Sequence, residues 1–152
     1  MRLRAVILDD EPITRQLLWT LCDRRGYEVL TFPDPGLCPL HVMHRCPCPQ
    51  GTVCADLLLC GLHLPEEAGL DFAEGLLRRG CVAPHLALLA GGWSEAAWAR
   101  AVRLGCRLFR KPFSSAEILG WFDIVETQVD PTRDLLDWRG QGWRIARPAR
   151  GG

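Results

Sequence analysis

The side chains with the clearest chemical potential are cysteines and histidines gathered in one stretch of the chain. The segment "CPLHVMHRCPCPQGTVC" contains Cys38, His41, His44, Cys46, Cys48 and Cys54. Thiolates and imidazoles are ligands that zinc prefers, and four of them complete a closed tetrahedral site. The best set is Cys38, Cys46, Cys48 and Cys54, with His41 or His44 as a replacement for one of them. Unliganded thiols or occasional disulfides in a surface loop are the alternatives.

A second group consists of charged residues that follow short apolar runs. Asp9 and Asp10 follow "RAVIL", and Lys111 comes shortly after "CRLF". Lys111 is the only lysine among 18 basic residues, and a compact ammonium does different chemistry from a planar guanidinium. Two adjacent carboxylates repel each other, so a nearby lysine can be kept for charge balance alone. A retained ligand site and a leftover ion-pair cluster therefore both stay open.

The composition narrows the class of protein. The 152 residues carry 18 basic and 18 acidic side chains, and 48% of the chain is hydrophobic. That length suits one domain with a tail, and balanced charge gives no general electrostatic case for binding nucleic acid or a membrane. The start does not develop into a signal peptide, so we expect a cytoplasmic protein, in which eight cysteines indicate metal binding or buried thiols rather than disulfides.

Apolar patterning indicates the elements that must position these side chains. Strands are expected at five runs: "RAVIL", "YEVLTF", "DLLLCG", "PHLALLAGG" and "CRLF". Amphipathic helices alternate with them, beginning near Pro12, Glu66, Ser94 and Ser114. Ser114 and Glu117 have the spacing of a capping box. This order predicts an α/β fold with a doubly wound, five-stranded parallel sheet.

Two segments fall outside the alternation. Residues 33–55 show no helical or strand period, so we interpret them as an irregular Cys/Pro-rich insertion that replaces or obscures the helix after the second strand. Residues 130–152 form a tail, in which Leu135, Leu136 and Trp138 could dock onto the body and the arginine-rich end is expected to be a flexible, solvated terminus. We therefore assign residues 1–129 to one domain.

Side chains at the carboxyl ends of the strands carry the chemistry of such sheets, and here those positions resemble a known family. "LDDEP", "GLHLP" and "KPF" occur in order on a matching rhythm of strands and helices. Over roughly residues 4–129 the chain resembles the receiver domain of bacterial two-component response regulators. The resemblance implies a magnesium-binding acidic pair, an aspartate that accepts a phosphoryl group, a hydroxyl residue after the fourth strand and a lysine after the fifth.

The chain departs from that pattern at two positions. The acidic pair is present as Asp9 and Asp10 and the lysine as Lys111, but the phosphoacceptor position is Gly61 and the hydroxyl position is Leu89 or Ala90. Glycine cannot accept a phosphoryl group. The resemblance therefore implies a degenerate phosphorylation pocket, with weak magnesium affinity because the third carboxylate is missing.

The favoured function is a non-enzymatic, phosphorylation-independent adaptor in two-component signalling. Its partner would be a kinase, a receiver or an effector that binds the last two helices, whose segments contain Trp93, Trp98, Trp121 and Phe122; a homodimer is a further possibility. A metal- or redox-sensing module that uses the cysteine-rich insertion is the alternative, and a weakly active receiver phosphorylated elsewhere is a third.

Overall fold

The computed structural model describes residues 2–61, 66–81 and 85–143. Five parallel strands form the central sheet in the order β2-β1-β4-β5-β6. Their bounds are β1 Arg4–Leu8, β2 Glu28–Phe32, β4 Leu57–Cys60, β5 His85–Ala90 and β6 Arg107–Arg110. The strand order reverses between β1 and β4, as in a doubly wound sheet. The prediction of an α/β fold with a five-stranded parallel sheet is therefore confirmed.

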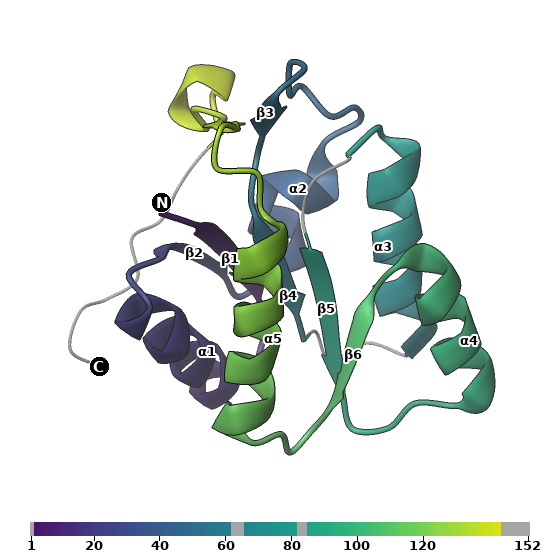
Figure 1. Ribbon diagram of the computed structural model, residues 1–152. Coiled ribbons are helices and arrows are strands. Elements are labelled where there is room, and N and C mark those ends of the chain that lie inside the picture. Colours follow the sequence, from purple (N-terminus) through teal and green to yellow (C-terminus); the bar gives the residue numbers. More distant parts are fainter. Residues whose placement is uncertain (1, 62–65, 82–84, 144–152) are drawn as a thin grey trace.

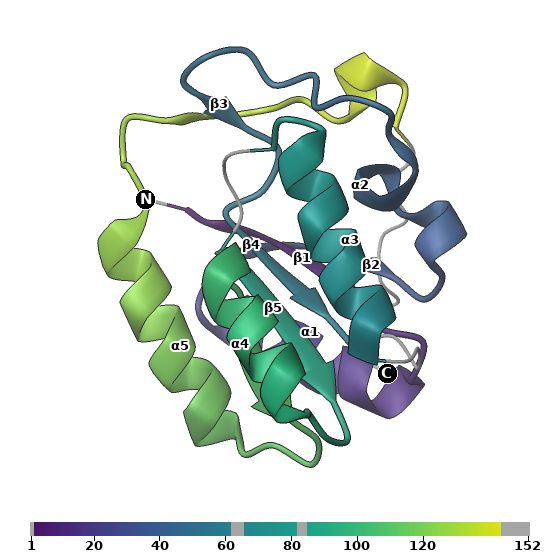
Figure 2. The ribbon, with the colours of Figure 1, turned by 90° about the vertical axis from the view of Figure 1, so that its right-hand side faces the viewer.

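Helices cover both faces of this sheet (Figures 1 and 2). One face packs against α1 (Pro12–Arg24) and α5 (Ser115–Gln128), through a core that includes Ile7, Leu59 and Phe122. The other face packs against α3 (Glu66–Arg78) and α4 (Glu95–Leu104), through Leu58, Leu70 and Leu88. Alternate residues of β4 thus enter different cores, which explains the unbroken apolar run of this strand.

The signals that begin the helices act as the sequence predicts. Ser114 and Glu117 form the capping box at the start of α5. Ser94 accepts a hydrogen bond from the Ala97 backbone N–H at the start of α4. That helix stops at Gly105, which has a φ of 75°, a conformation that glycine adopts without steric cost.

The cysteine-rich insertion contains more structure than its sequence indicates. We find a 3₁₀ turn η1 (Pro35–Leu37), a one-turn helix α2 (Pro39–Val42) and a short strand β3 (Thr52–Val53). The interpretation of residues 33–55 as wholly irregular is therefore wrong in detail. Elements of two to four residues are too short to produce a detectable hydrophobic period.

The tail holds the insertion in place. Its strand β7 (Asp134–Leu135) pairs in parallel with β3, and the 3₁₀ turn η2 (Arg139–Gln141) follows. Leu136 and Trp138 are buried, which confirms that this part of the tail docks. The indole Nε1 of Trp138 donates to the Cys54 carbonyl at 2.8 Å, and its ring stacks on Phe32. The arginine-rich end, with Arg144, Arg147 and Arg150, lies outside the described residues.

An ion pair joins the tail to the start of the sheet. The Arg133 guanidinium donates from Nε and Nη2 to the two carboxylate oxygens of Asp56, at 2.8 and 2.7 Å. Asp56 also accepts the Arg4 backbone N–H at 2.8 Å. A buried carboxylate needs such partners to be tolerated, so this pair helps fix the tail at the amino-terminal ends of the strands.

Candidate functional site

Asp9, Gly61 and Lys111 meet at the carboxyl ends of three strands. Leu8 of β1 lies opposite Cys60 of β4, and the Gly61 N–H donates to the Leu8 carbonyl at 2.8 Å, so Asp9 and Gly61 follow two paired strands. The Lys111 ammonium lies 3.3 Å from Asp9 Oδ2 and 3.2 Å from the Gly61 carbonyl oxygen. The structure thus brings together three of the residues that the sequence assigned to one pocket.

The two neighbouring aspartates have different environments. The Asp9 side chain is fully buried, whereas Asp10 is exposed. Burial raises the pKa of Asp9, while the Glu11 backbone N–H and the Lys111 ammonium act in the opposite direction. The Glu11 N–H donates to Asp9 Oδ1 at 2.8 Å and Lys111 binds Oδ2. Both oxygens of Asp9 are therefore already engaged.

Gly61 leaves space that the Asp9 carboxylate fills. A Cβ placed on Gly61 would overlap Asp9 Oδ2, and it would lie 3.1 Å from Asp9 Cγ and 3.4 Å from Lys111 Nζ. Real Cβ atoms do not overlap a carboxylate oxygen in this way, so a side chain at position 61 requires Asp9 to move. The absence of a side chain at Gly61 is thus coupled to the inward position of Asp9.

The end of β5 offers no hydroxyl group to this pocket. Leu89 is buried in the core beneath α1 and α5. Ala90 is the last residue of β5, and its carbonyl accepts the Lys111 N–H at 2.7 Å. Of the two candidates for the hydroxyl position, Ala90 is therefore the one adjacent to Lys111 along the pocket edge.

The pocket does not fit a magnesium ion in this arrangement. Magnesium needs oxygen ligands in octahedral geometry, but one Asp9 oxygen holds a backbone N–H and the other faces an ammonium. Among the described residues, no three or more His, Cys, Asp and Glu side chains are arranged to hold a metal ion. The arrangement instead balances one buried carboxylate with one lysine.

The insertion brings thiols together, but not in the set expected from the sequence. The Cys48 thiol lies in hydrogen-bonding range of the thiols of Cys46 and Cys54, and the Cys54 thiol hydrogen-bonds that of Cys81. Burial, with the Cys46 thiol, raises the pKa of Cys48 to about 12. Cys81, which lies three residues beyond the end of α3, is not in the ligand set that the sequence indicated.

The other candidate ligands of the insertion lie elsewhere. Cys38 is buried at the start of α2, where burial raises its pKa to about 11. The His41 ring stacks on Phe72 at 5.1 Å, and burial together with the charge of Arg79 lowers its pKa. His44 is exposed. The sequence signal that could have identified Cys81 is its position at the end of α3, since this end lies at the same edge of the sheet as the insertion.

Known structures share this fold. The non-phosphorylated HemR receiver domain from Leptospira biflexa is 21% identical, with a TM-score of 0.68 and coverage of 86% of this chain and 98% of that one. A Francisella response regulator receiver domain is 15% identical, with a TM-score of 0.66 and coverage of 85% of this chain and 100% of that one. Vibrio cholerae chemotaxis protein CheY4 is 18% identical, with a TM-score of 0.62 and coverage of 82% of this chain and 99% of that one. The chain therefore has the CheY-like fold of response regulator receiver domains.

Sequence comparison adds one relative. A probable transcriptional regulatory protein of Picosynechococcus sp. is 29% identical over 117 residues, which cover 76% of this chain and 46% of that protein. This chain thus spans less than half the length of that relative. No family model matches the chain. Within the described residues, we find no helix that is both long and apolar enough to cross a membrane.

Proposed function

We propose that this chain is a receiver-like signalling adaptor that acts through protein–protein contacts without being phosphorylated. The observation that carries the proposal is the position of the Asp9 carboxylate, which fills the space beside Gly61 and pairs with Lys111. Receiver-like topology supports a role in two-component signalling, and the residue types in the pocket argue against a phosphorylation switch.

The chemistry of phosphoryl transfer explains why this pocket is unsuited to it. An acceptor carboxylate must attack in line, and cations must neutralise the charge that develops on the phosphoryl oxygens. Here the acceptor position is Gly61, and the lysine that could offset the charge already contacts Asp9 and the Gly61 carbonyl. The internal carboxylate of Asp9 therefore already occupies the position beside Lys111, which favours a single fixed state of the pocket.

The last two helices offer apolar side chains to a partner. Trp98 and Val102 on α4 are 47% and 75% exposed, and Ile124 on α5 is 53% exposed. Trp121 and Phe122 are buried, and Trp93 is half-buried with its Nε1 bonded to the Phe109 carbonyl. Exposed tryptophan is a common anchor in protein interfaces, so Trp98 is the side chain we assign to partner binding, whether that partner is a kinase, a receiver, an effector or a second copy.

Labelling with a small phosphoryl donor tests the proposal. We expect the chain incubated with radiolabelled acetyl phosphate and magnesium to form no hydroxylamine-labile phosphoprotein, while an ordinary receiver domain treated in parallel is labelled. Stoichiometric labelling of this chain would contradict the proposal. Asp10→Asn provides the matched variant. If the wild type were labelled and Asp10→Asn were not, the exposed Asp10 would be identified as a substitute acceptor.

A second function, a metal- or redox-sensing module on a receiver scaffold, is favoured by the contacts among the thiols of Cys46, Cys48, Cys54 and Cys81. The two functions make different demands on a partner complex. An adaptor of the first kind binds its partner equally well with reduced, metal-stripped protein. A sensor changes its affinity when the thiols are oxidised or loaded with metal.

A further inference from the structure

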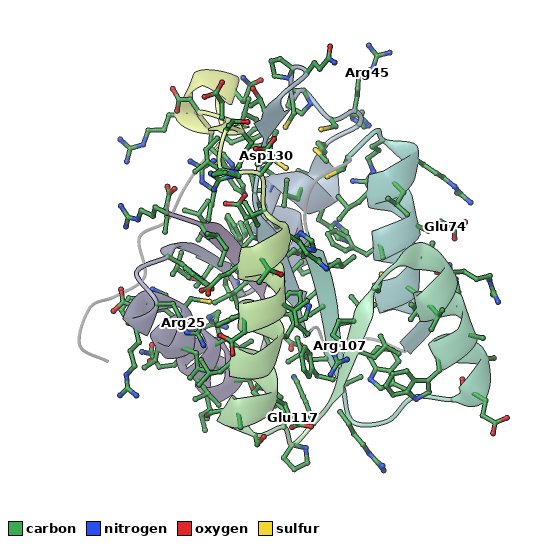
Figure 3. All side chains as sticks on the ribbon, viewed as in Figure 1. Arg25, Arg45, Glu74, Arg107, Glu117 and Asp130 are labelled. Atoms are coloured by element: carbon green, nitrogen blue, oxygen red, sulfur yellow. The ribbon has the colours of Figure 1, made fainter. Side chains whose placement is uncertain are left out.

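Four thiols from two separate segments converge at the amino-terminal edge of the sheet. Cys46, Cys48 and Cys54 belong to the loop around β3, and Cys81 follows α3. Their thiols contact one another in the order 46, 48, 54, 81. Figure 3 shows sulfur atoms gathered beneath Arg45, between β3 and the end of α3. This edge lies opposite the one that holds Asp9, Gly61 and Lys111.

Contacts that do not involve the thiols fix the backbone that carries them. The Cys46 N–H donates to the Arg79 carbonyl at 2.8 Å, which ties the loop to the end of α3 next to Cys81. Arg79 Nη1 in turn donates to the carbonyls of Leu40, His41 and Met43, at 3.0, 3.2 and 3.1 Å. The loop is therefore anchored to the helix end on its amino-terminal side.

The carboxyl-terminal side of the loop is anchored equally well. The Cys54 carbonyl accepts Trp138 Nε1 at 2.8 Å and Arg4 Nη1 at 3.2 Å. Thr52 and Val53 of β3, just before Cys54, pair with Asp134 and Leu135. Packing alone would need only apolar side chains at these positions, whereas four thiols in successive contact form a set of soft ligands on a pre-positioned backbone.

We propose that Cys46, Cys48, Cys54 and Cys81 together bind one thiophilic divalent metal ion, zinc being the best match. Four sulfur ligands suit zinc, and a site with four protein ligands leaves no position for water, so its role is structural. Binding replaces the four thiol protons, and a divalent ion with four thiolates carries two net negative charges. The hydrogen bonds from Arg79 Nη1 to the carbonyls of Leu40, His41 and Met43 bring a guanidinium to the same insertion.

The proposal changes the ligand set expected from the sequence and goes beyond the adaptor function. Cys38 is replaced by Cys81, which joins the insertion to the end of α3. As the structure stands, the described side chains are not yet arranged to hold a metal, and the thiols contact one another in a row. Metal binding would draw the sulfurs of the loop and of Cys81 around one centre and so tie the insertion, α3 and the tail into one unit.

Metal binding to the full chain tests this set of ligands. The protein is stripped with chelator under reducing conditions, zinc is added, and bound metal is measured after desalting. We expect about one zinc per chain in the wild type, in Cys38→Ser and in Cys106→Ser, but not in Cys81→Ser or Cys48→Ser. Cobalt(II) in place of zinc should give the intense sulfur-to-cobalt absorption and tetrahedral d–d bands of a four-thiolate site.

The controls separate loss of a ligand from loss of the fold. Cys106 is half-buried like Cys48 and packs against the same core, but it follows α4 and is not one of the four proposed ligands. The two serine variants are therefore matched, and circular dichroism shows whether each one is folded. If Cys81→Ser does not fold, Cys48→Ser decides. Retention of zinc by a folded Cys48→Ser or Cys81→Ser variant, loss of zinc from Cys38→Ser, or wild-type protein that binds less than about a tenth of an equivalent would overturn the proposal.

Discussion

The Asp9 carboxylate occupies the space that a side chain at Gly61 would need. Its Oδ2 lies 3.3 Å from the Lys111 ammonium, and a Cβ on Gly61 would overlap that same oxygen. The missing side chain and the inward carboxylate are therefore two halves of one arrangement. A single substitution at either residue disturbs both.

Gly61→Ala should destabilise the protein, because the added methyl group pushes the buried Asp9 side chain out of place. Overpacking of this kind typically costs about 1–3 kcal/mol. Urea unfolding measures the change in the free energy of unfolding. Gly91→Ala is the matched control, since a Cβ there meets no atom within 4 Å. In an Asp9→Ala background Gly61→Ala should cost much less, and equal costs in both backgrounds would contradict the coupling.

Gly61→Asp alone should not create a working phosphorylation switch. Lys111 is already held by Asp9, and the end of β5 has no hydroxyl at Leu89 or Ala90. We expect intact mass spectrometry after acetyl phosphate treatment to show little phosphorylated Gly61→Asp, and more when it is combined with Ala90→Thr. Full phosphorylation of the single variant would show that neither Asp9 nor the missing hydroxyl limits the chemistry.

Burial of Asp9 should make the free energy of unfolding depend on pH. Burial raises the pKa of Asp9 in the folded protein above its ordinary value of 3.8, so the folded state binds a proton more tightly than the unfolded chain. By linkage, this group's stabilising contribution is fully present below pH 3.8 and is lost as the pH rises through the raised pKa. Asp9→Asn should remove this pH-dependent loss of stability, because asparagine does not titrate.

Urea unfolding from pH 4 to pH 8 tests this sign. The stability of the wild type relative to Asp9→Asn should fall as the pH rises. Asp10→Asn, whose side chain is exposed, should follow the wild type closely. A wild-type advantage that grew with pH would mean that Lys111 and the Glu11 N–H outweigh burial, and that the pKa of Asp9 is lowered instead.

Trp138 should be the strongest single attachment of the tail. Its ring is buried against Phe32 and its Nε1 bonds the Cys54 carbonyl. Trp138→Ala should lower the free energy of unfolding by about 3–5 kcal/mol, and Trp138→Phe, which keeps an apolar ring but loses the hydrogen bond, by less. Trp98→Ala, at an exposed position, is the control. Hydrogen exchange should show faster opening of Thr52 and Val53 in the Trp138 variants.

Local signals in the sequence account for most of the fold. The strand Arg4–Leu8 and the capping box of Ser114 and Glu117 are found where their patterns place them, because burial on both faces and a reciprocal cap leave clear marks in a short window of residues. The meeting of Asp9 with Lys111 follows from topology, since both stand at carboxyl ends of strands in one parallel sheet.

Local sequence signals of this kind do not reveal pairings between distant segments. The contact between β3 and β7 joins residues about 80 positions apart through strands of only two residues each. Cys81 resembles a core cysteine in sequence, and only the end of α3 places it beside Cys54. The rotamer of Asp9 depends on the empty space at Gly61, which is a property of the packed site rather than of either residue type.

The most direct measurement of the central claim is a heteronuclear NMR titration of the full chain with magnesium and beryllofluoride, a mimic of the phosphoryl group on aspartate. The account predicts no site-specific shifts at Gly61, Ala90 or Lys111, and no change at Trp98 on α4, because the pocket lacks an acceptor and Lys111 is already paired with Asp9. Saturable shifts at Gly61 and Lys111 that spread to Trp98 would contradict it, since they would show a pocket that still receives a phosphoryl group and transmits the change to the proposed partner surface.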